Sequence, residues 1–215
     1  MKVVRAYRID IDGNDIHEVR DALGSISDRH RIDVINWEKY RYMPDVSFSA
    51  AYNRNLLFLS FYVKENFFRA VKTEPCSEVY EDSCVEFFVA PRDDGFYYNF
   101  EFNAIGTCLL ASGATRRDRK CATEEEMAKV IRMGSAGIEP IAERAGIFRW
   151  DLTAAISAEV FPGPHIKDLG GMSFRVNFYK CGDRLKVPHY LSWNPVITPA
   201  PDFHQPGFFG LMEFI

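Results

Sequence analysis

CVEFFVAPRDDGFYYNFEFN, residues 84–103, holds two runs of alternating side chains on either side of a turn. In 84–89 and in 97–103, every second side chain is large and apolar. This period of two is that of a strand, in which successive side chains point to opposite faces. The connecting residues 91–95 are rich in turn formers. The stretch therefore predicts a β-hairpin with one apolar face and one polar face.

The same period of two recurs along most of the chain, and few other patterns interrupt it. Residues 53–55 resemble a turn between two strands, which predicts a second hairpin. Residues 193–209 contain four prolines and predict an extended, irregular loop. Further strands are predicted at 46–50, 56–63, 105–110, 146–152 and 172–179, with a final edge strand at 209–214.

Two short helices are predicted outside these strands. Apolar residues at helical spacing, followed by a glycine, indicate one over 16–24. A Thr-Glu-Glu-Glu capping box begins the other, over 123–134, whose apolar stripe includes Val130 and Ile131. Many short strands, few helices and Pro/Gly-rich turns predict a β-sandwich or barrel. No linker divides the chain, so residues 1–215 are predicted to form a single domain.

The composition narrows the class of protein. The 215 residues are 47% apolar and 26% charged, with a net charge of −4, which is typical of a globular chain. The slight acidity gives no support to nucleic-acid binding, and no apolar run is long enough to span a membrane. The N-terminus becomes charged too early for a signal peptide, so a cytoplasmic location is predicted, and an extracytoplasmic one stays open.

No common catalytic or metal-binding motif is present. The sequence lacks a metalloprotease, P-loop, dinucleotide or nucleophile-elbow motif. Five cysteines without a C-x-x-C pair predict reduced thiols, with neither a disulfide scaffold nor a zinc site. The histidines, including His165, are scattered. The acidic residues 10–15 predict a polar turn instead of a calcium loop, and the basic run 116–120 predicts a solvated loop.

The polar faces of three predicted strands are the most informative feature. If these strands are neighbours, Glu86, Glu101, Asn103, Arg175 and Asn177 share one surface. Aromatic residues precede or follow these strands in the sequence. Sugar sites combine aromatic rings that stack on apolar ring faces with planar polar groups that bind hydroxyls. The alternative is the ordinary wet face of an antiparallel sheet.

Three segments resemble family 9 carbohydrate-binding modules and the related DOMON-like domains. They are YEDSCVEFFV at 80–89, FRWDL at 148–152, and the closing SWNP…FHQPGFFG between 192 and 210. The resemblance extends over roughly residues 45–215. It implies an immunoglobulin-like antiparallel β-sandwich, here with one or two short peripheral helices. It also implies non-catalytic sugar binding between two aromatic rings.

The resemblance also assigns roles to individual residues. Tyr80 and Phe203 match the two stacking aromatics, where tryptophan is usual. Glu86 matches a hydroxyl-binding carboxylate, Asn177 an amide contact, and Glu101 a position that is usually basic. The predicted site combines these residues with others of the polar face and of the closing segment. The predicted ligand-binding residues are Tyr80, Glu86, Glu101, Asn103, Asn177, Trp193, Phe203 and His204.

The function predicted is non-catalytic binding of a mono- or oligosaccharide, and which sugar stays open. No cofactor is predicted to be required. The resemblance is compatible with a structural Ca²⁺ ion, whose ligands the sequence does not locate. One alternative is a haem-binding DOMON-type module, with axial ligands among Met43, Met172, His189 and His204.

Two further alternatives stay open. One is a protein-interaction domain whose aromatic patch meets a partner protein. The other is an enzyme acting on a sugar, in which His204, Asp202 and Glu86 would converge.

Overall fold

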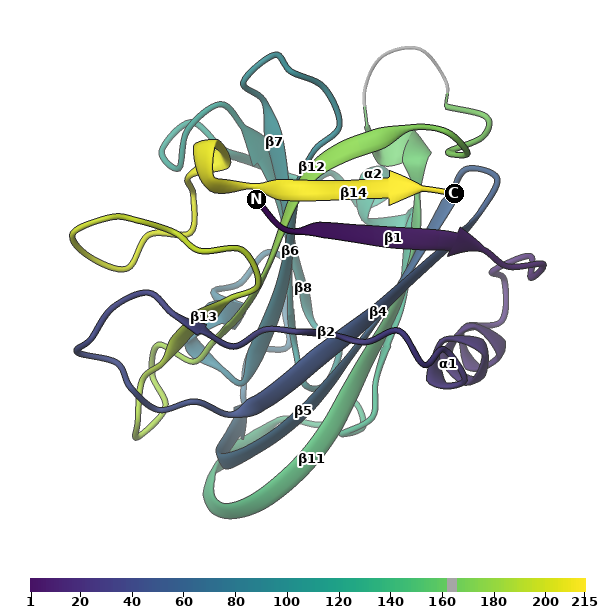
Figure 1. The fold of residues 1–215 in the computed structure, drawn as a ribbon. Helices are drawn as coiled ribbons and strands as arrows, with labels where there is room; N and C mark the ends of the chain where they lie inside the picture. The colour runs from purple at the N-terminus through teal and green to yellow at the C-terminus, as the bar shows by residue number, and fades with distance from the viewer. Residues whose placement is uncertain (162–165) are drawn as a thin grey trace.

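The computed structural model describes residues 1–161 and 166–215, so His165 lies outside the described residues. The described strands form two curled layers packed face to face, and the β-sandwich prediction is confirmed (Figure 1). One layer holds, in order, β10 (Val130–Gly134), β11 (Ile141–Ser157), β5 (Leu56–Ala70) and β4 (Asp45–Asn53). The other holds β14 (Gly210–Phe214), β12 (Ser173–Cys181), β6 (Cys84–Ala90), β7 (Tyr97–Asn103), β8 (Cys108–Gly113) and β9 (Lys120–Cys121).

Short elements complete the fold. Three small strands extend the layers: β2 (His30–Arg31) pairs with β4, β13 (Tyr190–Ser192) pairs with β12, and β3 (Val34–Ile35) pairs with β13. The helices are α1 (Ile16–Gly24), α2 (Glu124–Ala128) and the 3₁₀ turns η1 (Val79–Glu81), η2 (Ala158–Val160) and η3 (Pro206–Phe208). None of the described helices is long and apolar enough to cross a membrane.

Strand β1 (Val3–Arg8) joins the two layers. Its first half pairs with β14 and its last two residues pair with β4, in both cases parallel, and Figure 1 shows β1 and β14 running in the same direction. All other described pairings are antiparallel. The prediction that 209–214 forms an edge strand is therefore wrong, because β1 covers the outer side of β14. Val4 and Ala6 are fully buried and anchor this insertion.

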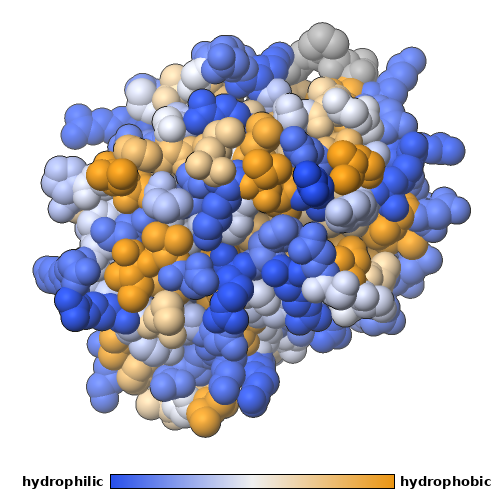
Figure 2. Space-filling model, in the orientation of Figure 1, coloured by the Kyte–Doolittle hydropathy of each residue, from blue (hydrophilic) through white to orange (hydrophobic). Residues whose placement is uncertain are grey.

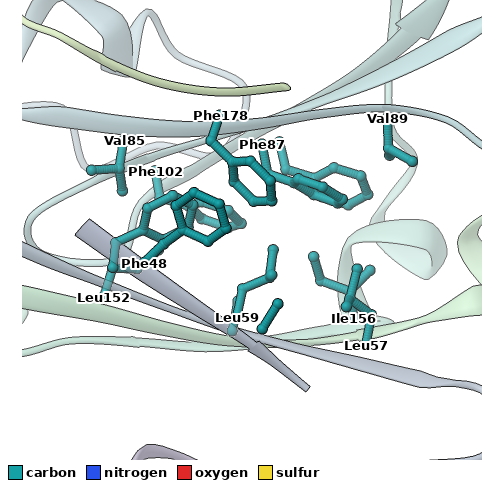
Figure 3. Close-up of a cluster of buried hydrophobic side chains, with 14 of the residues drawn as sticks. Phe48, Leu57, Leu59, Val85, Phe87, Val89, Phe102, Leu152, Ile156 and Phe178 are labelled. Carbon is teal, nitrogen blue, oxygen red and sulfur yellow. The ribbon is translucent and has the colours of Figure 1, made fainter. Parts of the chain in front are cut away.

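Apolar side chains from the two layers meet in the main core. The rings of Phe48 on β4 and Phe178 on β12 stack at 3.7 Å between centroids, and Phe87 on β6 lies 5.1 Å from Phe178. Figure 3 shows Leu59 and Leu152, from β5 and β11 of the layer that holds Phe48, on the opposite side of the core from Phe87 and Phe178. Each fully buried side chain of this size contributes about 1.5–3 kcal/mol. The two predicted hairpins, β4–β5 and β6–β7, are confirmed with the expected alternation.

The helix predictions are confirmed in one case and corrected in the other. Helix α1 matches its prediction, with Asp15 as its N-cap at the end of the polar turn. The capping box of Thr123 and Glu126 is present, but α2 ends at Ala128. Val130 and Ile131 instead begin β10, which pairs with β11. A five-residue helix gains little by propagation, and two β-branched residues pair better at a sheet edge.

The polar face of the second layer is not the wet surface expected of an open sheet. Its middle is buried by Phe88, Tyr97, Tyr179 and other aromatic residues. The closing loop, residues 193–209, folds over it and is drawn in yellow-green beside β13 in Figure 1. Alternation along a strand fixes which side chains share a face, but a remote segment decides whether that face meets water.

The cysteine prediction is wrong for one pair. Cys76 and Cys121 are joined by a disulfide, with their Cα atoms 6.3 Å apart and 45 residues of separation. Cys84, Cys108 and Cys181 are free and buried. Neither half-cystine belongs to a spacing motif. The two meet because the fold brings the segment before η1 next to β9.

The visible surface is mixed in character. On the face that carries β1 and β14, Figure 2 shows hydrophobic residues in small groups among hydrophilic ones. Val3 and Tyr7, both on β1, are among the exposed large apolar residues. This face therefore presents no single continuous apolar patch.

Candidate functional site

A cavity of about 630 Å³ opens on the face of the second layer that is turned away from the main core. Strands β6, β7 and β12 form its floor, and η1, the loop between β8 and β9, the start of β13 and the closing loop form its walls. Its volume lies within the range of about 300–1,000 Å³ that is usual for small-molecule sites. Its lining residues are Tyr80, Glu86, Glu101, Arg116, Arg117, Arg119, Cys181, Asp183, Tyr190, Pro201, Asp202, Phe203 and His204.

Two buried carboxyl groups form the floor. Glu86 and Glu101 are directly opposite on β6 and β7, and each is 3% exposed. Burial raises the pKa of Glu101 to about 7, against the charge of Arg119 and a hydrogen bond from Asn99. Burial, followed by the charge of Glu101, raises the pKa of Glu86 well above its usual value. Because the pair retains a proton at neutral pH, the floor offers both a donor and acceptors to a ligand hydroxyl.

Aromatic rings form one wall. Phe203 stacks on Tyr179 at 4.1 Å between centroids, so one of its faces is covered. Tyr190 contacts Phe203 edge-on at 6.2 Å, and Trp37 lies 5.9 Å from Phe203 beneath the wall. Tyr80 lines the cavity from η1 and is half-buried. The wall therefore combines a fixed ring, Phe203, with more accessible ones.

A basic loop between β8 and β9 forms the rim. Arg119 Nη1 lies 3.6 Å from Glu101 Oε1, and Arg116 Nη1 lies 4.0 Å from Asp202 Oδ1. Arg117 also lines the cavity. The prediction of a solvated loop at 116–120 is confirmed for Arg116 and Arg117, which are exposed at the rim, and is wrong for Arg119, whose side chain is largely buried against Glu101. Strand β8 runs back beside β7 and ends opposite Tyr97, and the loop that follows it brings the arginines to the cavity.

His204 and Asp183 complete the polar lining. The Tyr97 hydroxyl lies 3.0 Å from His204 Nδ1. Burial, with Arg119 and Arg116 nearby, lowers the pKa of His204 to about 2, so its ring is neutral. Burial raises the pKa of Asp183 to about 6, opposed by Arg116. The cavity thus holds a neutral imidazole and several acids that are easily protonated.

The structure brings Tyr80, Glu86, Glu101, Phe203 and His204 of the predicted site together in one cavity. It places the other three predicted residues, Asn103, Asn177 and Trp193, outside the cavity lining.

Asn103, Asn177 and Trp193 are occupied by other partners. The side-chain amide of Asn103 donates to Lys72 O and Asp82 Oδ2, and its oxygen accepts from Thr107 N. Asn177 exchanges hydrogen bonds with the backbone of Asn194.

Trp193 lies in the main core, where it packs edge-on against Phe48 and Phe178. Arg175, on the predicted polar face, instead donates to Pro206 O and secures the closing loop. Asn103, Asn177 and Arg175 thus have the predicted strand parity, but their hydrogen bonds go to backbone groups of remote segments and not to the cavity.

Several lining residues were missed by reasoning from the sequence. Cys181 and Tyr190 carry no motif, and Asp183 follows β12 in a turn. The only local signal for the arginines is that the basic run comes soon after strands bearing buried acids. Among residues 1–161 and 166–215, the group of three or more His, Cys, Asp or Glu side chains close enough to share an ion is Cys84, Glu86 and Cys181. The residues described do not include a three-carboxylate cluster that would fit the Ca²⁺ ion that the resemblance implies.

Comparisons with known proteins agree with this architecture. The profile of carbohydrate-binding family 9 matches residues 24–214. A protein of Bacteroides uniformis ATCC 8492, solved as a proposed carbohydrate-binding protein, is 38% identical with a TM-score of 0.92, covering 100% of this chain and 99% of that one.

Two solved structures of a family 9 module from Caldicellulosiruptor kristjanssonii share the fold. The complex with glucose has a TM-score of 0.60 at 11% identity, over 100% of this chain and 96% of that one. The complex with cellotriose has a TM-score of 0.56 at 13% identity, over 99% and 93%. No curated protein matches the sequence.

Proposed function

The chain belongs to carbohydrate-binding family 9, and from that premise we propose that its cavity binds a mono- or oligosaccharide without catalysis. The observation that carries the proposal is the meeting of aromatic and buried polar residues in one cavity. Tyr80 and Phe203 on its walls and Glu86 and Glu101 on its floor come from four separate segments of the chain. The 38% identical relative, solved as a proposed carbohydrate-binding protein, supports the same class of ligand.

The lining suits the chemistry of a sugar. A pyranose presents apolar C–H faces, which pack on aromatic rings, and hydroxyls, which both donate and accept hydrogen bonds. Tyr80 offers a partly open ring, and the protonated and ionised carboxyls of the floor supply both kinds of polar partner. A shallow site of this kind predicts a Kd of roughly 10⁻³ to 10⁻⁵ M.

Acid–base catalysis is not part of the proposal. His204, Asp202 and Glu86 do line the same cavity. Burial lowers the pKa of His204 to about 2, so this ring is a poor proton acceptor near pH 7. Of the four residues considered as haem ligands, His204 alone lines the cavity, while His189 is hydrogen-bonded to Lys180 in the interior.

The test is a titration of the purified protein with glucose, cellobiose and cellotriose, followed by Trp fluorescence and confirmed by calorimetry. Trp37 is the expected reporter, because its ring lies 5.9 Å from Phe203 and 6.3 Å from Tyr190. Tyr80→Ala is expected to weaken binding at least tenfold, a loss of about 1.4 kcal/mol. Phe203→Ala is expected to abolish it.

A matched control separates the cavity from general effects of losing an aromatic ring. Tyr7→Ala removes an exposed ring on β1, outside the cavity lining, and is expected to bind as the parent does. Far-UV circular dichroism checks that each variant is folded, which matters most for the buried Phe203. Binding by folded Tyr80→Ala and Phe203→Ala with unchanged affinity would refute the proposed site, and no response to any sugar at millimolar concentration would refute the ligand class.

A further inference from the structure

Two free cysteines and a glutamate meet beneath the cavity. Cys84 on β6 and Cys181 on β12 are directly opposite each other in the antiparallel pair. Glu86 lies two residues after Cys84, so its side chain projects from the same face of β6. The two sulfur atoms and one carboxylate oxygen all lie within 4.8 Å of one another. Cys181 Sγ donates to Glu86 Oε1 at 2.9 Å.

From this geometry we propose that Cys84, Glu86 and Cys181 bind a thiophilic divalent cation of the zinc class, with a fourth coordination position open to the cavity. Zinc–sulfur bonds of about 2.3 Å and zinc–oxygen bonds of about 2.0–2.2 Å place tetrahedral ligand atoms about 3.6–3.8 Å apart. The donor atoms need shifts of no more than about 1 Å to reach that spacing. All three side chains lie on paired strands, which hold their Cβ atoms in place.

The donor set selects the class of ion. Two thiolates with one carboxylate favour zinc and its soft neighbours over calcium and magnesium, which prefer oxygen ligands. Apart from the 2.9 Å contact of Cys181 with Glu86 inside the triad, the thiols make only long contacts with backbone oxygens among the described residues: Cys84 Sγ lies 3.6 Å from Val85 O, and Cys181 Sγ lies 3.6 Å from Tyr80 O. The site therefore has donor capacity that the protein interior does not use.

The position of the triad provides both entry and an open ligand. Glu86 and Cys181 line the cavity, and Cys84 lies behind them with no exposed surface. Three protein ligands with a free fourth position is the arrangement of zinc sites that exchange water or substrate. An ion there would be completed by water or by a hydroxyl of a cavity ligand.

Charge also permits the site to be empty or filled. Without an ion, both thiols keep their protons and the Cys181 thiol donates to Glu86 Oε1, so the triad can remain buried unliganded. Binding releases these protons to water and leaves two thiolates and one carboxylate around the dication. Arg119, which faces the neighbouring Glu101, lies on the same side of the layer and offsets the remaining negative charge.

The test uses cobalt as a spectroscopic substitute for zinc. A background variant, Cys76→Ser/Cys108→Ser/Cys121→Ser, leaves Cys84 and Cys181 as the only thiols. Titration of this protein with Co²⁺, without oxygen, is expected to give a thiolate-to-cobalt charge-transfer band that saturates at one ion per chain. One equivalent of Zn²⁺ is expected to displace the cobalt.

Point variants locate the ligands. Cys84→Ser or Cys181→Ser in this background is expected to lose at least half of the band, and Glu86→Gln to weaken binding at least tenfold. Glu81→Gln is the matched control, because it removes a nearby carboxyl that lies outside the cavity lining, and it is expected to leave stoichiometry and band intact.

Three results would overturn the proposal: no band in the folded background variant, a band unaffected by either cysteine change, or equal losses in Glu86→Gln and Glu81→Gln. If the triple variant does not fold, the disulfide-bonded parent and its Cys108→Ser variant serve instead. Sugar titrations with and without Zn²⁺ are scored separately, since neither proposal depends on the other.

Discussion

A buried ion pair between the two layers allows a direct test of how much paired charges in the interior contribute to the free energy of unfolding. Lys180 Nζ lies 2.9 Å from Glu65 Oε2, and both side chains are fully shielded from water. The ammonium also donates to Cys181 O at 2.8 Å and to His189 Nε2 at 2.9 Å. Glu65 Oε1 in turn accepts from Trp150 Nε1 at 2.6 Å. Burial, and the charge of Lys180, lower the pKa of His189 well below its usual value, which keeps the ring neutral and able to accept.

Lys180→Met is expected to destabilise the protein by about 3–5 kcal/mol, because it leaves Glu65 buried without its counter-charge. For a chain of this size that loss lowers Tm by roughly 6–20 °C. Glu65→Gln is expected to cost about 2–3 kcal/mol, since Nζ keeps two acceptors and Gln can still accept from Trp150. The double variant removes both charges and is expected to be at least about 2 kcal/mol more stable than the sum of the single losses predicts.

The assay is equilibrium unfolding in urea, followed by Trp fluorescence and circular dichroism, for the parent and the three variants. Arg8 and Asp168 form a matched control, because their 2.8 Å ion pair is about half exposed. Arg8→Met is expected to cost less than about 1 kcal/mol. Additive losses in the double variant, within about 0.5 kcal/mol, would refute the claim that the buried charges stabilise each other.

Further predictions concern the disulfide, the buried acids and the basic rim. Mass spectrometry after alkylation is expected to find one disulfide and three free thiols, and five alkylated thiols without reductant would contradict the disulfide. Cys76→Ser/Cys121→Ser is expected to lower the unfolding free energy by about 4 kcal/mol, because the disulfide closes a loop of 45 residues. Because burial raises the pKa of Glu101 from 4.5 to about 7, the folded state holds the proton more tightly, and unfolding free energy is expected to fall by about 3 kcal/mol as pH rises from 4.5 to 7. Glu101→Gln should remove that part of the slope, and an unchanged pH profile in urea unfolding would contradict this assignment. Arg119→Gln removes the cation 3.6 Å from Glu101 and is expected to raise the pKa of Glu101 further, measured by NMR titration of its carboxyl; an unchanged value would show that the pair does not interact.

Part of the cavity was predictable because strand parity is a local property. Glu86 and Glu101 were placed on one face by the alternation in 84–103, and the structure sets them directly opposite each other. The closing loop was recognised from its prolines, which cannot continue a strand. Tyr80 and Phe203, which came from the family resemblance and not from any periodicity, do line the cavity.

Other residues were assigned to the ligand-binding site on the same grounds but lie outside the cavity lining. Asn103 and Asn177 have the right parity, yet their amides are used by backbone groups that only the fold brings near. Trp193 is in the closing segment, yet packs into the main core. Arg119 was assigned to solvent with the rest of its basic run, yet it lies beside the buried Glu101, because the run itself does not show which of its side chains turns inward.

The sequence by itself determined the sandwich: its period of two specifies strands, its turns specify the hairpins, and apolar spacing for one helix and a capping box for the other indicate where the helices lie. These features depend on a few neighbouring residues, whose steric and hydrogen-bonding preferences act locally. Only the tertiary structure decided that β1 inserts in parallel beside β14, that Cys76 meets Cys121, and that the closing loop covers part of the polar face and forms a wall of the cavity there. Those outcomes depend on which remote segment removes a given surface from water, and burial of that kind is a property of the whole chain.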